Sequence, residues 1–349
     1  MKGARSRPDH LPRIAITMGD PAGVGAEIIM KALKAPILET LFPLVIGDRG
    51  ILEKVRRALG TPWPEEMNVL DLKNVDFSCH SWGMVKREYG RASGEYIEKA
   101  IELALKGEVE AVVTCPIQKE AFREAGYPYP GHTEMFARIT GAPRHALMYL
   151  HGAFRVVHAS LHVALKDVPS HITEDRVFDV ITVAHEGLNA LGIERPRIGV
   201  AGLNPHAGEG GLFGREEIEA VAPAVAKAKE KGLDVSGPFP ADIIFSMLRG
   251  RAFDVVVAMY HDQGGIPAKL LGFEWDKGKG RWAHVQGVNV TLGLPIIRTS
   301  VIHGTAFDIA GRGLAHPGSL VDALLLASDM VHVKRGETLT AGGKGIIRT

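Results

Sequence analysis

Short runs of apolar, largely β-branched residues recur along the chain, and most are followed by a glycine-containing turn and then by a stretch with helical spacing. Runs that are apolar at consecutive positions, rather than at every second one, are typical of strands covered on both faces. The strand–helix pairs predicted in this way are 13–18 with 26–33, 43–46 with 51–59, 109–114 with 119–125 and 197–203 with 215–231, and a further strand covers 253–259.

This alternation predicts an α/β fold, in which helices cover a parallel sheet on each side. Glycine usage agrees with it, because the chain has 41 glycines among 349 residues. That is about 12%, against a usual value near 7%. The glycines cluster where a strand turns into a helix rather than in a low-complexity block. No motif repeats with a fixed period, which argues against a solenoid.

Length, charge and cysteine usage narrow the class of protein. At roughly 150 residues per domain the length suggests about two domains. The 41 Lys and Arg nearly balance the 40 Asp and Glu, whereas nucleic-acid-binding domains are usually strongly basic, so we expect no nucleic-acid partner. No stretch approaches the roughly 20 apolar residues that span a bilayer, so we expect no membrane association.

Cys79 and Cys115 form no CxxC motif, which is typical of a reduced, cytoplasmic protein. Residues 1–12 lack a signal-peptide pattern and are expected to be a flexible tail.

Three histidines follow three of the predicted strands. His162 follows the run 154–161, His206 follows 197–203 and His261 follows 253–260. One histidine at a strand end is more often a hydrogen-bonded structural residue than a ligand, and the spacing matches no local metal motif. Three at equivalent ends of one sheet suit a divalent cation of the catalytic zinc type, with cobalt, manganese or iron also compatible. Both interpretations remain open from the residues alone.

The glycine-rich segment 19–25 lies between a predicted strand and a predicted helix, where a phosphate-binding loop would lie. It matches neither GxGxxG nor GxxxxGK[ST]. A tight turn that packs the helix N-terminus is at least as good an interpretation as a nucleotide site.

Seven segments together resemble the 4-hydroxythreonine-4-phosphate dehydrogenase family. They are TMGDPAGVGAE (17–27), PIQKEAF (116–122), YPGHTE (129–134), GLNPHAGEGGLFGREE (202–217), GPFPAD (237–242), YHDQG (260–264) and GVNVTLGLPIIRTS (287–300). The resemblance implies a two-domain fold like that of isocitrate and isopropylmalate dehydrogenases, with a central cleft, assembled as a homodimer. The first domain would comprise 13–135 plus roughly 300–349, and the second roughly 136–299.

The resemblance also implies an activity: oxidation of a secondary alcohol by NAD or NADP, followed by decarboxylation of a small phosphorylated hydroxy acid. One divalent metal (zinc, magnesium, cobalt or manganese) would be held by His162, His206 and His261, with His261 reaching across the dimer interface. Such a metal lowers the pKa of the substrate hydroxyl and stabilises the enolate left by carbon dioxide.

Further roles are carried over by motif position. Substrate would be bound by His132, Thr133, Lys269, Asn289 and Arg298, among which Lys269 and His132 are the catalytic candidates. The cofactor would lie against Gly287, Asn289, Thr291, His303, Gly304 and Asp308. Lys269 is a candidate proton donor or acceptor, and Arg298, which ends a predicted strand at 294–297, offers a bidentate grip on phosphate or carboxylate.

The chain departs from the family pattern at three places. Gln118 stands where Asn is usual, Ile302 stands where Asp is usual, and the segment 274–286, with Trp275 and Trp282, is longer than usual. That segment is either a surface excursion or a lid beside the substrate.

The substrate also has alternatives. YPGHTE is similar to relatives acting on 4-phospho-threonate, 4-phospho-erythronate or aromatic cis-dihydrodiols. Two other function classes are further alternatives. A phosphate acyltransferase would not need three strand-end histidines, and a non-catalytic binding protein would not need His, Lys and Arg converging on one cleft.

Overall fold

The computed structural model describes residues 11–34, 36–64, 67–278 and 280–337, and only the backbone of Arg281. Within them one sheet of 11 strands runs through the molecule in the order β3-β2-β1-β4-β13-β12-β5-β6-β9-β7-β8. Its strands are β1 (Arg13–Thr17), β2 (Phe42–Gly47), β3 (Asn68–Asp71), β4 (Ala111–Thr114), β5 (Ala146–His151), β6 (Phe154–His158), β7 (Ile198–Ala201), β8 (Val235–Phe239), β9 (Val255–Ala258), β12 (Val288–Leu292) and β13 (Ile297–Val301).

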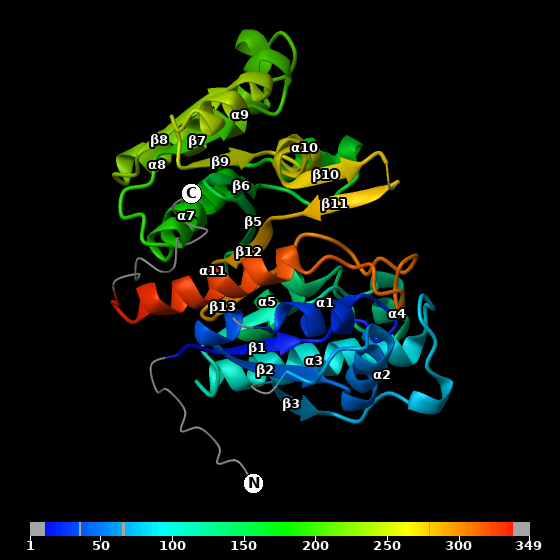
Figure 1. Cartoon of the computed structure of the whole chain (residues 1–349). Helices are drawn as coiled ribbons and strands as arrows, with labels where there is room; N and C mark the ends of the chain where they lie inside the picture. The colour runs from blue at the N-terminus through cyan, green and yellow to red at the C-terminus, as the bar shows by residue number, and fades with distance from the viewer. Residues whose placement is uncertain (1–10, 35, 65–66, 279, 338–349) are drawn as a thin grey trace.

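The sheet has two parallel halves joined by an antiparallel centre. One half is β3-β2-β1-β4-β13, and the other is β6-β9-β7-β8. Between them, β12 pairs antiparallel with both β13 and β5, and β5 pairs antiparallel with β6. Figure 1 shows the two halves one above the other, with the centre between them. The α/β fold class expected from the sequence is therefore confirmed. The proposed domain boundaries stay a prediction.

Helices cover both faces of this sheet. They are α1 (Gly25–Ala32), α2 (Arg49–Leu59), α3 (Arg87–Leu105), α4 (Lys119–Glu124), α5 (His132–Thr140), α6 (Val168–His171), α7 (Glu174–Asn189), α8 (Ala222–Glu230), α9 (Ala241–Arg249), α10 (His261–Gly272) and α11 (Gly318–Lys334). Strand β13 lies between two of them. The Thr299 hydroxyl donates to the Ala323 carbonyl of α11 on one face, whereas the Arg298 guanidinium lies over the Phe136 ring of α5 on the other.

Most predicted elements form within a few residues of their expected bounds, but two expectations are wrong. The expected strand at 294–297 starts only at Ile297, because Pro295 in that run cannot donate to a strand ladder. Arg298 is thus the second residue of β13 and does not end a strand. The expected helix 215–231 begins with a wider π-type turn at Glu217–Val221 before α8.

The segment 274–286, where the sequence departs from the expected family pattern, lies in a separate hairpin. Its strands are β10 (Phe273–Asp276) and β11 (Arg281–Val285), paired antiparallel apart from the large sheet. The expected tail falls largely on residues 1–10, which lie outside the described part, as does Lys279 of the hairpin turn. No helix in the described ranges is long and apolar enough to cross a membrane.

The glycine-rich segment between β1 and α1 is a tight, packed turn. Gly19 has a φ of 73°, and a Cβ atom at this position would lie 2.3 Å from the Pro116 carbonyl oxygen. Only glycine satisfies both constraints. The close approach to the chain after β4 accounts for the glycine without a phosphate.

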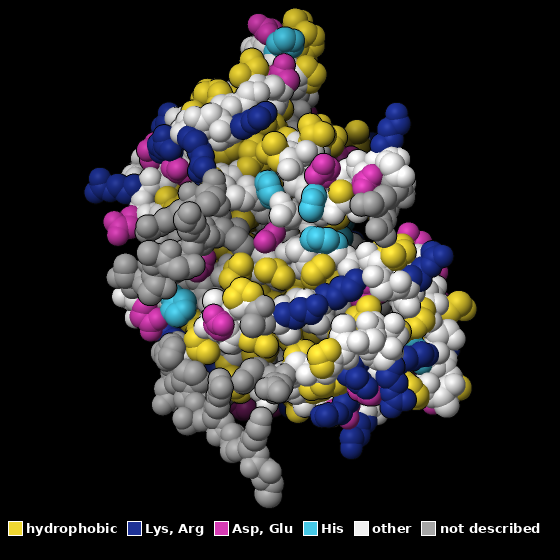
Figure 2. All heavy atoms as spheres, in the orientation of Figure 1, with side chains coloured by type: hydrophobic (Ala, Val, Ile, Leu, Met, Phe, Trp, Pro, Cys, Tyr) yellow, Lys and Arg dark blue, Asp and Glu magenta, His cyan; other side chains and the backbone are white. Residues whose placement is uncertain are grey.

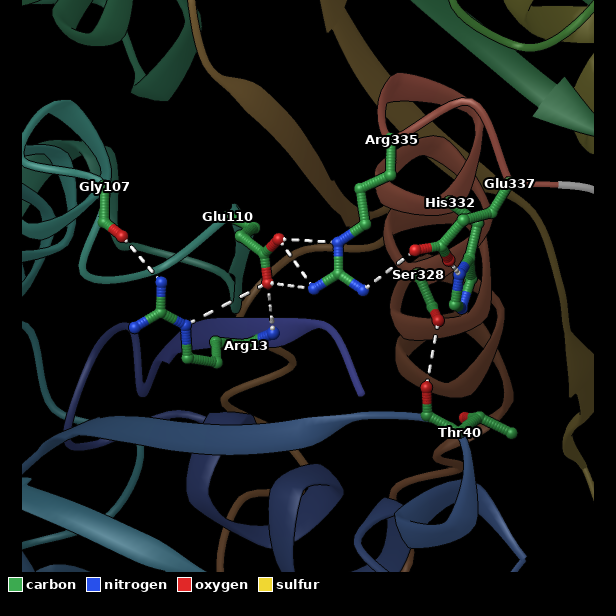
Figure 3. A network of polar contacts seen from close by, with 8 residues as sticks. All are labelled: Arg13, Thr40, Gly107, Glu110, Ser328, His332, Arg335 and Glu337. Atoms are coloured by element: carbon green, nitrogen blue, oxygen red, sulfur yellow. Dashed lines mark hydrogen bonds and ion pairs between the residues drawn. The ribbon is translucent and has the colours of Figure 1, made fainter. Parts of the chain in front are cut away.

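A charged cluster ties the last helix to the first strands, as Figure 3 shows. The Glu110 carboxylate, just before β4, accepts two hydrogen bonds of 2.9 Å from the Arg335 guanidinium after α11 and one of 3.0 Å from the Arg13 backbone N–H of β1. Nearby, the Ser328 hydroxyl of α11 donates to the Thr40 carbonyl. These contacts hold α11 against the half of the sheet that contains β1 and β4.

We expect Glu110→Gln to lower the free energy of unfolding by about 1–2 kcal/mol, because it removes a charged acceptor shared by two elements. The measurement is the midpoint of urea unfolding at constant pH. Glu53→Gln is the matched control, since the described ion pairs of Glu53 join it to Arg56 and Arg57 of its own helix α2, and it should leave the midpoint almost unchanged. Equal effects of the two substitutions would contradict a cross-linking role for Glu110.

Candidate functional site

The centre of the sheet presents a row of polar side chains to one face. In the strand register Tyr149 of β5 lies opposite Asn289 of β12, Asn289 lies opposite Ser300 of β13, and Ser300 lies opposite Thr114 of β4. Since alternate residues of a strand face the same side, Arg298 lies on that face as well. Two of these strands come from residues after 287 and two from residues before 152, so only the folded sheet assembles the row.

A cavity of about 210 Å³ lies over this row. Its lining brings together residues of both halves of the sheet: Thr114, Cys115, Pro116, Ile117, Lys119, Gly131, His132, Thr133, Glu134, Leu147, Tyr149, His162, Asn289, Arg298, Ser300, Val301, His303 and Gly304. Among the residues predicted from the sequence, His132, Thr133, His162, Asn289, Arg298, His303 and Gly304 are thus brought to one place.

The cavity contains buried polar atoms that lack a partner within the described residues. They are His132 Nε2, Asn289 Oδ1, Arg298 Nε and His303 Nε2. Buried polar groups are nearly always hydrogen-bonded in folded proteins. Four such atoms around one small cavity therefore indicate a site built for a polar ligand.

Arg298 and Lys119 give the cavity its charge. Arg298 is only 3% exposed, and its guanidinium donates to the Thr291 hydroxyl at 2.8 Å and the Thr114 hydroxyl at 2.6 Å. Burial lowers the pKa of Arg298 to about 9, so it still carries its charge at neutral pH. Both hydroxyl partners are neutral, and Glu134, another lining residue, attracts the guanidinium electrostatically. The Nε of Arg298, which has no described partner, stays available to an anionic ligand.

The neighbouring histidines are held neutral. Burial, with Arg298 and Lys119 nearby, lowers the pKa of His132 well below its ordinary value, and burial together with Lys119 lowers the pKa of His162. His132 is also the first residue of α5, where unpaired backbone N–H groups favour an anion. The cavity thus combines two cations, the Glu134 carboxylate, a helix N-terminus and neutral imidazoles.

Two of the three candidate metal ligands lie close together. The ring centroids of His162 and His261 are 6.1 Å apart. His162 Nε2 is 3.3 Å from Lys119 Nζ, whereas His261 contacts the Tyr149 hydroxyl at 3.0 Å through Nε2 and Asp262 at 2.6 Å through Nδ1. Neither His206 nor any other residue completes a group of three potential metal ligands within the described part of one chain.

His206 lies in a strained segment after β7. His206, Ala207 and Glu209 all have φ values between 44° and 53°, the left-handed region that non-glycine residues rarely adopt. The Glu217 carboxylate holds this turn, since it accepts from the Asn204 backbone N–H at 2.7 Å. Strain of this kind persists where the surroundings enforce it, and it is concentrated at functional sites.

The remaining predicted residues lie around the cavity rather than in its lining. Lys269 Nζ lies 6.0 Å from the centre of the Tyr149 ring, and Thr291 contacts Arg298. Gly287 contacts α11, since its carbonyl accepts from the Ser319 hydroxyl at 2.7 Å. Asp308 lines a second cavity, which shares His303 and Gly304 with the first.

Beyond the seven predicted residues, the lining contains residues that sequence reasoning missed, among them Lys119, Tyr149 and Ser300. Lys119 is the first residue of α4, the helix that follows β4, so the strand-end rule that selected the histidines could have selected it as well. Tyr149 and Ser300 lie inside strands, and only the strand register shows which face they occupy. The departure at Gln118 has a local explanation, because its side chain accepts from the Glu120 N–H as the N-cap of α4.

Asp20 lies behind the cavity wall and carries a displaced pKa. Its backbone N–H donates to the Pro116 carbonyl, one carboxylate oxygen accepts from the Ala22 N–H at 2.8 Å, and the other has no described partner. Burial raises the pKa of Asp20 from 3.8 to about 7. Between pH 3.8 and about 7, the Asp20 carboxyl group therefore keeps its proton in the folded protein but releases it in the unfolded chain.

This linkage stabilises the fold fully below pH 3.8, and the stabilisation is lost as the pH rises to about 7. The variant Asp20→Asn has no carboxyl group here and should not lose stability in this way as the pH rises. We therefore expect the free energy of unfolding of the variant, relative to that of wild type, to rise by about 2 kcal/mol between pH 5 and pH 8. The measurement is urea unfolding at a series of pH values, with the exposed Asp167→Asn as control. A constant difference between Asp20→Asn and wild type across this range would contradict the raised pKa.

The fold and the cavity define a class: an α/β protein that binds a small anionic ligand between the two halves of its sheet. Residues 39–327 match the family model described as "Pyridoxal phosphate biosynthetic protein PdxA". The chain belongs to this family.

Individual relatives agree with that assignment. The chain is 49% identical to the "Putative D-threonate 4-phosphate dehydrogenase" of Bradyrhizobium diazoefficiens, over 89% of this chain and 94% of that protein. It is 43% identical to the 4-hydroxythreonine-4-phosphate dehydrogenase of Desulforapulum autotrophicum, over 92% and 96%. The crystal structure of 4-hydroxythreonine-4-phosphate dehydrogenase from Klebsiella pneumoniae superposes with a TM-score of 0.81 at 40% identity, over 93% and 99%. The isopropylmalate-dehydrogenase-like fold expected from the sequence is thereby confirmed.

Proposed function

We propose that this chain is a divalent-metal-dependent dehydrogenase that uses NAD or NADP to oxidise, and then decarboxylate, a 4-phosphorylated 3-hydroxy acid. The observation that carries the proposal is the small cavity with two cations and four buried polar atoms that lack a partner among the described residues. Glu134 supplies one negative charge to the lining, and a substrate with a phosphate and a carboxylate supplies further anions for Arg298 and Lys119. Family membership supplies the reaction class.

The substrate we propose is 4-hydroxy-L-threonine 4-phosphate or a close analogue. D-threonate or D-erythronate 4-phosphate is the second candidate, favoured by the name of the Bradyrhizobium relative. The two differ in carrying an amino group or a hydroxyl group beside the carboxylate.

Within the cavity, His132, Thr133, Asn289 and Arg298 bind and orient the substrate. The neutral His132 ring has one buried nitrogen free to donate to, or accept from, a substrate oxygen. Arg298 grips an anionic group from the floor of the cavity, where burial strengthens the attraction. Lys269, beside the Tyr149 ring, moves the proton that decarboxylation requires.

For the metal we propose the ligands His162, His206 and His261. The close pair of His162 and His261 and the strained turn at His206 fit this role, with the third ligand contributed by a second copy of the chain. When bound, the metal supplies Lewis-acid polarisation of the substrate hydroxyl and of the carbonyl formed from it.

A homodimer is part of the same proposal. Large apolar side chains are exposed on α10, which starts at His261, and in the loop that contains His206: Ile266 is 65% exposed, Leu270 79%, Leu212 72% and Phe213 49%. Apolar patches of this kind mark interaction surfaces. A second copy seated on them would bring histidines of two chains together. We assign the enzyme to the cytoplasm, in keeping with its two free cysteines.

The test is NAD(P)H formation with a panel of 4-phosphorylated 3-hydroxy acids and their unphosphorylated analogues. We expect turnover only with phosphorylated acids, loss of activity after treatment with a chelator, and recovery with added divalent metal. Turnover that survives complete metal removal would contradict the metal-dependent mechanism. Acyl transfer to phosphate without any NAD(P)H would instead support the transferase alternative.

A further inference from the structure

Three neighbouring strands are followed by the loops that carry the candidate metal ligands. Strand β9 lies between β6 and β7 in the sheet. His162 follows β6, His206 follows β7 and His261 follows β9. A metal site needs its ligands held to within about 0.5 Å of their working positions. Whatever fixes these three loops relative to one another therefore affects metal binding.

The side chain of Gln263, in the first turn of α10, joins two of these loops. The paired residues of β7 and β9 end at Val200 and Val257. Beyond that point, Gln263 Oε1 accepts from the Met259 N–H at 2.7 Å, and Gln263 Nε2 donates to the Gly202 carbonyl at 2.8 Å. One side-chain amide thus accepts from one backbone and donates to the other, as a peptide group does within a sheet. It connects the two chains where their own pairing has stopped.

The third loop is tied to the same point. Ser160, which follows β6, donates to the Met259 carbonyl from its backbone N–H at 3.1 Å and from its hydroxyl at 2.8 Å. The N–H of Met259 is therefore held by Gln263, and its carbonyl is held by Ser160. One continuous chain of hydrogen bonds connects the loops that follow β6, β9 and β7.

The loop after β7 depends on such contacts because it is strained and projects from the fold. Figure 1 shows this green segment beyond the sheet at the top of the view, and Figure 2 shows hydrophobic side chains at the same place. At its base, Glu217 accepts from the Asn204 N–H and Gln263 donates to the Gly202 carbonyl. A strained turn persists only where its surroundings enforce it. Without the contact to Gly202 the turn is free to relax, and His206 moves with it.

We propose that Gln263 is a positioning residue of the metal site, which fixes the loops of His162, His206 and His261 relative to one another. This inference rests on the proposed function, because that function supplies the metal. Gln263 acts through the backbone and not as a ligand, since both ends of its amide bond to main-chain groups. Residues that orient metal ligands without touching the metal typically change its affinity about 10- to 100-fold when they are replaced.

The test is titration of the metal-free, full-length protein with Co²⁺, followed through the visible absorption of the bound ion. Gln263→Met keeps the length of the side chain but can form neither hydrogen bond. We expect it to weaken Co²⁺ binding at least about tenfold and to alter the absorption bands, because the ligands lose their arrangement. Gln263→Asn keeps the amide but is one methylene shorter, so it should reach one backbone partner and weaken Co²⁺ binding less.

Asn74→Leu is the matched control. The Asn74 amide is half-buried, as that of Gln263 is, and it also forms two hydrogen bonds: it donates to Glu95 at 2.6 Å and accepts from the Tyr96 hydroxyl at 2.9 Å. It follows β3, in the half of the sheet that carries none of the three histidines. Its replacement should lower the midpoint of urea unfolding to a similar extent, but leave the Co²⁺ affinity and the absorption bands as in wild type.

The alternatives give different results. If Gln263→Met folds and binds Co²⁺ as wild type does, while turnover by wild type depends on metal, the inference is wrong and the proposed function stands. Should Gln263→Met fail to fold, the same result with Gln263→Asn decides against the inference. Equal weakening in Asn74→Leu would show a general effect of lower stability and also contradict it.

The proposed function can fail separately. A wild-type protein that binds Co²⁺ in the Gln263-dependent way but turns over none of the phosphorylated acids would overturn the proposed reaction and leave the inference standing. A wild-type protein that binds no Co²⁺ and oxidises the phosphorylated acids without any metal would overturn the inference together with the metal-dependent mechanism.

Discussion

Arg298→Met should reduce kcat/KM by about a thousandfold or more and, at the same time, make the protein harder to unfold. The loss of activity follows from removing a buried cation that grips the anionic substrate, since bidentate contacts from arginine are strong and geometrically specific. The gain in stability follows from the surroundings of the guanidinium. Its described hydrogen bonds go to the hydroxyls of Thr291 and Thr114, and its Nε has no described partner.

Burial also makes the charged guanidinium unfavourable, and for this reason the pKa of Arg298 is lowered. Replacing such a buried charge by an apolar side chain of similar length removes the desolvation cost of the charge, so we expect the free energy of unfolding to rise. The measurements are steady-state kinetics with the phosphorylated acid and the midpoint of urea unfolding without ligand. A variant that loses both activity and stability would show that Arg298 mainly supports the fold.

Arg155→Met is the matched control. Arg155 is likewise a buried arginine of the sheet, only 2% exposed, but it donates to the backbone carbonyls of Ala153 and Asp254 and lines neither cavity. Its replacement leaves buried carbonyls without donors. We therefore expect lower stability and nearly unchanged kinetics, the opposite of Arg298→Met.

Mixing two inactive variants should restore activity if the metal site is shared between subunits. Each of His162→Ala, His206→Ala and His261→Ala should be inactive as a pure homodimer. After subunit exchange, His162→Ala mixed with His206→Ala should regain about a quarter of wild-type activity, because about half of the dimers are mixed and each has one intact site of two. The measurement is NAD(P)H formation after controlled dissociation and reassembly.

A second mixture identifies which histidine crosses the interface. If His162 and His261 of one chain act together, as their 6.1 Å ring separation suggests, then His162→Ala mixed with His261→Ala should stay inactive. Recovery in this mixture would instead support the prediction from the sequence that His261 reaches the partner's site. Background activity in both mixtures would contradict a site shared between chains.

The sequence predicts most of the fold because its signals are local. Apolar runs and glycine turns mark β1, β2, β4, β7 and β9 to within a few residues. The strand predicted before Arg298 is misplaced because Pro295 interrupts the apolar run. Since proline is excluded from the interior of a strand ladder, the sequence itself contained the information needed to place this strand correctly. The hairpin was missed although it shows aromatic residues on both sides of a glycine-containing turn, at Trp275 and Trp282, which is a hairpin pattern.

The site is less predictable because its members meet through strand order rather than through spacing. His132, Asn289 and Arg298 were found by their motifs and do line one cavity. Tyr149 carries no motif, and its role depends on pairing with a strand that lies 140 residues further along the chain (Tyr149 with Asn289). The sequence names His162, His206 and His261 as metal ligands, but the proposed site takes them from two chains, so the described residues of one chain do not bring all three together.

The order in which strands enter the sheet bears on synthesis of the protein. Strand β4 is completed at Thr114, but its neighbour β13 begins only at Ile297, and α11, which packs on β13 and β4, ends at Lys334. A chain emerging from the ribosome therefore exposes one edge of its first half until β13 has been made. Unpaired strand edges are templates for aggregation. The pairing of β13 with β4 closes this edge, and the contact between Arg335 and Glu110 can form only later, once the residues that follow α11 have been made.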